Sequence, residues 1–134
     1  MAINSKRKGK NGELEFSNLC KKHGFNTRRS QQYAGIHGDA DVVGLDGIHI
    51  EVKRIERLNI EQALQQAERD KKEGEIPIVA HRRNREEWKV TMRAKDWFEL
   101  YRAWKNVDTV IMTRQFQEEL VVEKQKESEV EHDG

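Results

Sequence analysis

The sequence predicts an α/β fold in which helices flank one mixed central β-sheet. Apolar residues recur at helical spacing in three segments, and short segments rich in β-branched residues lie between them. The expected order is α-β-β-β-α-β-β-α, which is not a regular βαβ repeat. No glycine-rich phosphate loop follows any strand, so a nucleotide-binding doubly wound fold is not indicated.

The first expected helix covers residues 12–23, with Asn11 as its N-cap and Gly24 directly after its end. Its apolar stripe consists of Phe16, Leu19 and Cys20. At about 100° per residue, Glu13 lies on this same face, whereas Glu15 points away. An acidic side chain on the inward face of a helix requires a partner or a function.

The later elements follow from alternation and turn residues. The expected strands cover residues 25–30, 40–44, 48–54, 78–82 and 88–92. The expected helices cover residues 58–73 and 94–104, and a short strand is expected at residues 109–112. Residues 31–38 are expected to form a loop. The core is expected to include the aromatic residues of the last helix, which are Trp97, Phe98, Tyr101 and Trp104.

One domain is expected, because 134 residues with a mean hydropathy of −0.98 can fill one modest core. We expect a mobile basic arm at residues 1–10, the folded domain at residues 11–114 and an acidic tail at residues 115–134. The tail holds seven acids and two bases, so a net charge of +1 leaves +6 on the rest. A basic body suits a protein that binds a polyanion.

The composition also bears on location and on redox chemistry. No apolar segment approaches the roughly 20 residues of a membrane span, and no apolar segment follows the basic N-terminus as in a signal peptide. A cytoplasmic protein without a membrane partner is therefore expected. Cys20 is the single cysteine, which excludes an intramolecular disulfide and a multi-cysteine zinc site. A buried structural thiol is expected.

The segment from Asp41 to Lys53 carries the chemistry. Side chains alternate along a strand, so His49, Glu51 and Lys53 share the face opposite the apolar one. A three-residue loop at residues 45–47 places Asp41 opposite Glu51 and buries Val42 beside its partner Ile50. A two-residue turn would instead push the carboxylate of Asp41 into the apolar face.

Two carboxylates placed opposite one another repel, and a divalent cation between them would explain the pair. Mg²⁺ prefers oxygen ligands, and Asp41, Glu51 and the Val52 carbonyl can supply three. Lys53 can then orient or activate the attacking water and offset phosphate charge. The alternative is a solvent-exposed hairpin with an ion pair between Glu51 and Lys53, and the pattern alone does not decide between the two.

Asp41, nine further residues and then Glu51-Val52-Lys53 match the signature of the PD-(D/E)XK nucleases. Together with the segments Arg7-Lys8-Gly9, Glu13, His23-Gly24-Phe25, Arg29-Ser30 and Ile76-Pro77, the chain resembles the archaeal Holliday-junction resolvases and their phage relatives. The resemblance covers about residues 6–80. It implies a restriction-endonuclease-like fold, dependence on Mg²⁺ with Mn²⁺ as a substitute, and a homodimer that cuts branched double-stranded DNA. A phage protein of this kind would act in the cytoplasm of a bacterial or archaeal host.

The resemblance also implies roles for individual residues. Glu13, Asp41 and Glu51 correspond to the metal-binding acids, with Asp39 as a rival to Asp41, and Lys53 corresponds to the catalytic lysine. Arg29 and Ser30 are placed near the scissile phosphate. One glutamine of the following helix is expected near the site, among Gln62, Gln65 and Gln66. The expected DNA-binding residues are Lys8, Arg28, Arg29, Ser30, Gln66, Arg82 and Arg83, although an ordinary solvated surface is the alternative for the basic ones.

Parts of the chain depart from the resolvase pattern. The loop at residues 31–38, the segment at residues 81–85, the aromatic helix and the acidic tail have no counterpart there. They leave open a nicking, restriction-like or repair nuclease acting on another form of DNA. A DNA-binding module that does not cut and a plain interaction protein are further alternatives, against which the complete set of inward acids argues.

Overall fold

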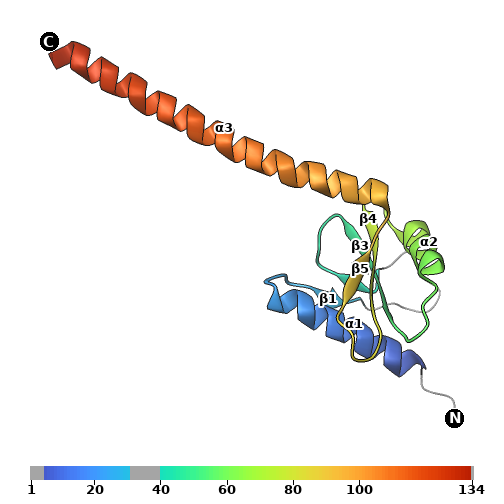
Figure 1. Cartoon of the computed structure of the whole chain (residues 1–134). Helices are drawn as coiled ribbons and strands as arrows, with labels where there is room; N and C mark the ends of the chain where they lie inside the picture. Colours follow the sequence, from blue (N-terminus) through green and yellow to red (C-terminus); the bar gives the residue numbers. More distant parts are fainter. Residues whose placement is uncertain (1–4, 31–39, 134) are drawn as a thin grey trace. The chain divides into compact units, whose positions relative to one another are not determined.

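The computed structural model of the chain describes residues 5–30 and 40–133, with side chains from residue 9 to residue 130 outside that gap (Figure 1). The chain divides into two compact units, Met1–Arg93 and Ala94–Gly134, and each is described by itself. The expected loop at residues 31–38, the rival acid Asp39 and the first four residues of the basic arm lie outside the described residues.

The elements follow in the predicted order, and the fold-class prediction is confirmed. They are α1 (Ser5–Lys22), β1 (Arg28–Arg29), β2 (Val42–Val43), β3 (Ile48–Arg54), α2 (Ile60–Asp70), β4 (Ile76–Arg82), β5 (Lys89–Thr91) and α3 (Ala94–Asp133). The five strands form one sheet in the order β1-β2-β3-β4-β5. Only the described pair β3–β4 is parallel, because α2 carries the chain back between these two strands.

The sheet is covered by α1 on one face and by α2 on the other (Figure 1). The α1 face holds the larger core cluster, formed by Phe16, Cys20, Val42, Ile50, Val52, Ile78 and Ala80. The α2 face holds a smaller cluster, formed by Ala63, Leu64, Ala67 and Val79. Since both faces are covered, the central strand β3 is buried from His49 to Val52, polar residues included. Cys20 is buried, as predicted.

The hairpin between β2 and β3 has the predicted register. Val42 pairs with Ile50, and both side chains are fully buried. The N–H of Ile48 donates to the Leu45 carbonyl at 3.1 Å, which closes the predicted three-residue loop. Gly47 has φ +82°, a left-handed conformation that glycine adopts without steric cost. Burial of one apolar face therefore selected the register, as expected.

The first helix begins earlier than predicted. It starts at Ser5, so Asn11 lies inside it and is not its N-cap, and residues 5–10 of the expected arm are helical. Lysine and arginine favour helices, and a helix that has already nucleated extends at little cost. β1 and β2 contain two residues each and are shorter than expected.

The second unit is one helix, α3, which runs through the predicted strand at residues 109–112, so that prediction was wrong. The segment has neither proline nor glycine to end the helix, and it is rich in good helix formers. Within this unit Trp97 is 49% exposed and Trp104 is 59% exposed, and the placement of the aromatic residues in the core stays a prediction. The rings contact one another along the helix, with 5.5 Å between the centroids of Trp97 and Tyr101.

No helix in the described part of the chain is long and apolar enough to cross a membrane. The compact first unit ends at Arg93, whereas the sequence placed the end of the domain at residue 114. The assignment of function to residues 11–114 stays a prediction.

Candidate active site

A cavity of about 260 Å³ opens where α1 lies beside β3. All four residues that the sequence singled out for catalysis line it, although they come from distant parts of the chain: Glu13, Asp41, Glu51 and Lys53. Its other lining residues are Gly9, Val52, Arg54, Ile55 and Gln66. The fold therefore brings the predicted residues together, while their catalytic role stays a prediction.

Asp41 is held against both neighbours of Glu51. Its N–H donates to the Ile50 carbonyl at 2.9 Å, and its carboxylate accepts a hydrogen bond from the Val52 N–H at 2.8 Å. Burial raises the pKa of Asp41 to about 7, with the negative charge of Glu51 as the next cause, while the Val52 N–H acts in the opposite direction. The two carboxylates repel each other, as the register predicted.

Glu51 is buried and is hydrogen bonded to His49, a partner that sequence reasoning missed. Each residue is 1% exposed, and 2.8 Å separates Nε2 of His49 from Oε1 of Glu51. The other ring nitrogen of His49 lies 3.9 Å from a carboxylate oxygen of Glu75. The available signal was the spacing, since residues two apart on a strand share a face. The imidazole occupies one oxygen of Glu51 and fixes its orientation.

Glu13 reaches the cavity from α1 and is paired with Arg29 of β1. The Arg29 Nε lies 2.5 Å from a Glu13 carboxylate oxygen, and the Glu13 side chain is 17% exposed. Gly12 allows the close approach of the helix, because a Cβ atom there would lie 2.9 Å from the Cβ of Arg54. The predicted inward orientation of Glu13 is confirmed, and Arg29 lies beside the site.

Glu15 does not point away, so that prediction was wrong. Its carboxylate pairs with Arg54 at 3.1 Å and with Arg82 at 2.8 Å, and it accepts a hydrogen bond from the Trp88 indole at 3.1 Å. Helical periodicity describes the angle between Glu13 and Glu15 around the axis. It does not describe how far the sheet extends beneath the helix, and here the ends of β3 and β4 reach Glu15.

Lys53 lines the cavity, and no ion pair forms with it in the part of the chain that the structure describes. The alternative of a solvent-exposed hairpin with a Glu51–Lys53 pair does not hold, because Glu51 is buried and bonded to His49. Among the three competing glutamines, only Gln66 lines this cavity. Gln62 and Gln66 both line the adjoining cavity, which shares Lys53 and Ile55 with the first.

The donor set fits a hard divalent cation. Asp41 and Glu51 offer carboxylate oxygens in one buried place, and Mg²⁺ is commonly held by one or two carboxylates together with water molecules. Across the described residues, no three His, Cys, Asp or Glu side chains are assembled closely enough to hold a metal ion as they stand. Glu13 is turned toward Arg29. A cation therefore fits two acids directly, with Glu13 as the third acid of the cavity.

The remaining predicted DNA-binding residues lie in different places. Ser30 is beside the site, because its N–H donates to the Asp41 carbonyl at 3.0 Å. Arg28 is exposed on β1, and Lys8 belongs to α1. Arg82 is half-buried in its pair with Glu15, and Arg83 is exposed and lines a separate cavity.

A comparison with solved structures finds similarity to part of this chain. No family model and no curated protein matches the chain. The chain is similar to the solved structure of Hjc, a Holliday junction resolvase from the archaeal hyperthermophile Archaeoglobus fulgidus. The TM-score is 0.46 at 23% identity, over 63% of this chain and 76% of that chain.

Proposed function

We propose that this chain is a divalent-metal-dependent DNA endonuclease that hydrolyses phosphodiester bonds in branched duplexes. One observation carries the proposal. Three inward acids and a lysine line one cavity, although they are supplied separately by α1, by the residue before β2 and by β3: Glu13, Asp41, Glu51 and Lys53. Acids that crowd together in a partly buried cavity are costly to the fold, and a site that holds a cation against phosphate explains them.

The roles of the residues follow from their contacts. When bound, Mg²⁺ or Mn²⁺ would polarise the phosphate and lower the pKa of the attacking water. Asp41 and Glu51 would hold the ion, with Glu13 and the Val52 carbonyl as further oxygen donors. Lys53 makes no ion pair within the described residues, so its ammonium group is available to orient water and to offset phosphate charge. Arg29 would keep Glu13 in place beside the phosphate.

The preference for branched DNA is proposed from the sequence resemblance. Paired cuts in a four-way junction require two sites, and a symmetric homodimer would supply them. We propose that the enzyme acts in DNA recombination or DNA repair in the cytoplasm.

The test is cleavage of a labelled four-way junction beside a linear duplex and a single strand of matched sequence, with Mg²⁺ and with EDTA. Symmetric cuts that require Mg²⁺ and occur only in the junction are expected. Equal cleavage of the linear duplex would replace the junction preference with a nicking, restriction-like or repair nuclease. Binding without any cleavage would leave a DNA-binding module, and the Glu51→Gln variant controls for contaminating nucleases.

A further inference from the structure

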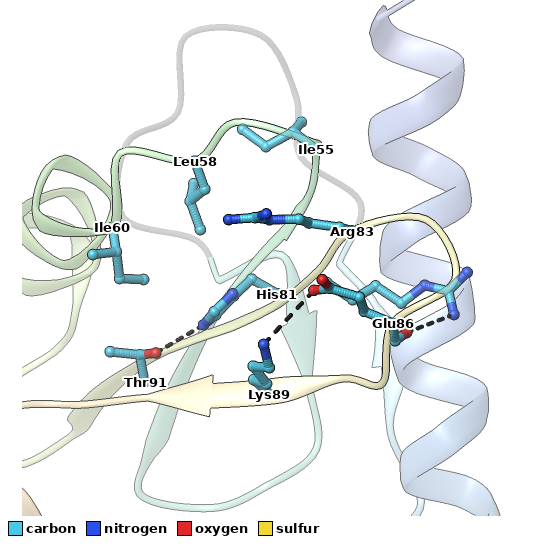
Figure 2. A pocket seen from close by; sticks show the side chains of 9 residues that line it. Ile55, Leu58, Ile60, His81, Arg83, Glu86, Lys89 and Thr91 are labelled. Atoms are coloured by element: carbon cyan, nitrogen blue, oxygen red, sulfur yellow. Dashed lines mark hydrogen bonds and ion pairs between the residues drawn. The ribbon is translucent and has the colours of Figure 1, made fainter.

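A second cavity, of about 310 Å³, lies between β4, β5 and the connection that leads from β3 to α2 (Figure 2). One wall is apolar and is formed by Ile55, Leu58 and Ile60. The opposite side carries nitrogen-bearing side chains. In Figure 2 the side chain of Arg83 extends into the cavity, and its guanidinium lies between Leu58 and His81.

This cavity is aligned with the candidate active site by the register of the sheet. Lys53 of β3 pairs with His81 of β4, and His81 pairs with Lys89 of β5. The three side chains therefore form one row across three strands, starting at the proposed catalytic lysine. Neighbouring strands are about 4.8 Å apart, which places Lys89 about 10 Å from Lys53. Ile55 lines both cavities.

The groups in the second cavity suit an anion. Among the described residues, the guanidinium of Arg83 has no hydrogen-bond or ion-pair partner, so its fork of donors is available. Lys89 is 3.7 Å from a Glu86 oxygen, but both side chains are well exposed, and such a pair is weak.

His81 contributes a neutral wall to the cavity. Its Nε2 lies 2.7 Å from the Thr91 hydroxyl, and burial followed by the charge of Lys89 lowers the pKa of His81, which favours the uncharged ring. The positive charge that a ligand would meet comes from Arg83 and Lys89.

We propose that the second cavity binds a phosphate of the DNA backbone that flanks the cleaved bond, through Arg83 and Lys89. The inference rests on the proposed function for the identity of the ligand. A guanidinium matches two oxygens of a phosphate, and the apolar wall suits the adjoining deoxyribose. The rise of about 3.4 Å per nucleotide is measured along the axis of the duplex, and successive phosphates lie about twice as far apart because the strand also winds around that axis. A distance of about 10 Å therefore corresponds to about one or two nucleotides from the bond at Lys53.

The experiment measures binding of a labelled four-way junction by fluorescence anisotropy in EDTA, at several salt concentrations, so cleavage plays no part. Arg83→Gln is expected to weaken binding about tenfold and to lower the slope of log K against log salt by about 1. Arg85→Gln removes the same charge from the same turn but outside the cavity, and it is expected to keep nearly the wild-type slope. Equal effects of the two variants, or an unchanged slope for Arg83→Gln, would overturn the proposal.

A second experiment tests which phosphate of the DNA backbone the cavity binds. An uncharged methylphosphonate about one or two nucleotides from the cleaved bond should weaken binding by the wild type but not by Arg83→Gln. An identical position profile for the two proteins would contradict the assignment. Both variants change exposed side chains, and matching thermal unfolding curves confirm that each is folded.

A third experiment tests whether the cavity binds the DNA backbone or free inorganic phosphate. Inorganic phosphate is titrated into the protein and followed by the NMR shifts of the amides near Arg83. Saturation at millimolar phosphate, together with unchanged DNA binding by Arg83→Gln, would assign the cavity to a free anion and overturn the proposal. Binding with the expected Arg83 dependence but no cleavage would keep the phosphate site and remove the endonuclease.

Discussion

The carboxylates of Asp41 and Glu51 oppose one another in a partly buried cavity. A metal-free protein therefore carries an electrostatic cost there, which the Val52 N–H and the His49 ring offset only in part. Sites that bind charged ligands commonly accept such a cost, because the ligand removes it.

Asp41→Asn should separate function from stability. Loss of a residue that only supports a metal ligand typically lowers activity roughly 10–100-fold. Because Asp41 is proposed to bind the metal directly, Asp41→Asn is expected to lower cleavage by more than that. In EDTA at pH 8 its melting temperature should equal or exceed that of the wild type, because the repulsion is gone. Asp46→Asn, at the exposed turn of the hairpin, serves as the control. Wild-type cleavage by Asp41→Asn would refute the proposed role.

The raised pKa of Asp41 predicts a pH dependence with a definite sign. The carboxyl titrates near 3.8 when unfolded and near 7 in the fold, so protonation stabilises the native state. That contribution is complete below about pH 4 and is lost as the pH rises through about 7. Urea unfolding in EDTA should therefore show wild type losing stability relative to Asp41→Asn between pH 5 and pH 8. Parallel curves for the two proteins would contradict the shift.

Cation binding should show the opposite trend, because a metal competes with the proton on Asp41. Calorimetric titration with Mn²⁺ is expected to give tighter binding at pH 8 than at pH 6. The Asp41→Asn variant should lose most of this difference. A pH-independent affinity in the wild type would place the cation elsewhere.

His49 is expected to matter for both stability and metal affinity. His49→Ala leaves buried Glu51 without its hydrogen bond, which should cost about 1–3 kcal/mol of unfolding free energy. Loss of the group that orients a ligand should also weaken cation binding about 10–100-fold. Glu75→Gln, whose contact with the ring is the longer one at 3.9 Å, should have a smaller effect on both measurements. The reverse order of effects would argue against this role.

At the scale of elements, α1 determines whether the third acid reaches the site. Its two glutamates face different parts of the sheet: Glu13 contacts Arg29, and Glu15 contacts Arg54 and Arg82. The helix comes close enough for both because Gly12 lacks a side chain where it meets β3. The position of α1 therefore determines both sets of contacts: those of Glu13 at the cavity, and those of Glu15 at the C-terminal ends of β3 and β4.

Two glycines of α1 offer a matched test of this close approach. Gly9→Ala meets nothing within 4 Å and should raise stability by up to about 1 kcal/mol through helix propensity. Gly12→Ala gains the same propensity, but its Cβ would lie 2.9 Å from the Cβ of Arg54, so a net loss of stability is expected. Chemical denaturation of the two variants decides the matter. Equal stabilisation by both would show that α1 has room to move.

At the scale of the whole molecule, both core clusters and the residues packed on them are drawn from positions up to Met92. Arg93 completes this unit by pairing with Glu61 and Glu68 of α2. We therefore expect a chain that ends at Arg93 to fold, with a cooperative thermal transition by circular dichroism. A non-cooperative transition would show that α3 contributes to the stability of the first unit.

The sequence determined the features that depend on neighbouring residues. Loop length and burial of one face set the register of Val42 against Ile50, and this register placed Asp41 beside Glu51. The order of elements followed from periodicity and from turn residues. The start of α1 and the length of α3 were predicted less well, because strong helix formers extended both helices past the signals that were read as boundaries.

Only the tertiary structure decided which distant residues meet. The parallel pairing of β3 with β4 aligns Lys53 with His81, and the packing of α1 brings Glu15 to Arg82. Periodicity describes the face on which a side chain lies but not the strand or helix that covers that face. The bond from His49 to Glu51 needed burial of the face of β3 that carries both side chains, and the cavity around Arg83 needed three separate segments of chain to assemble.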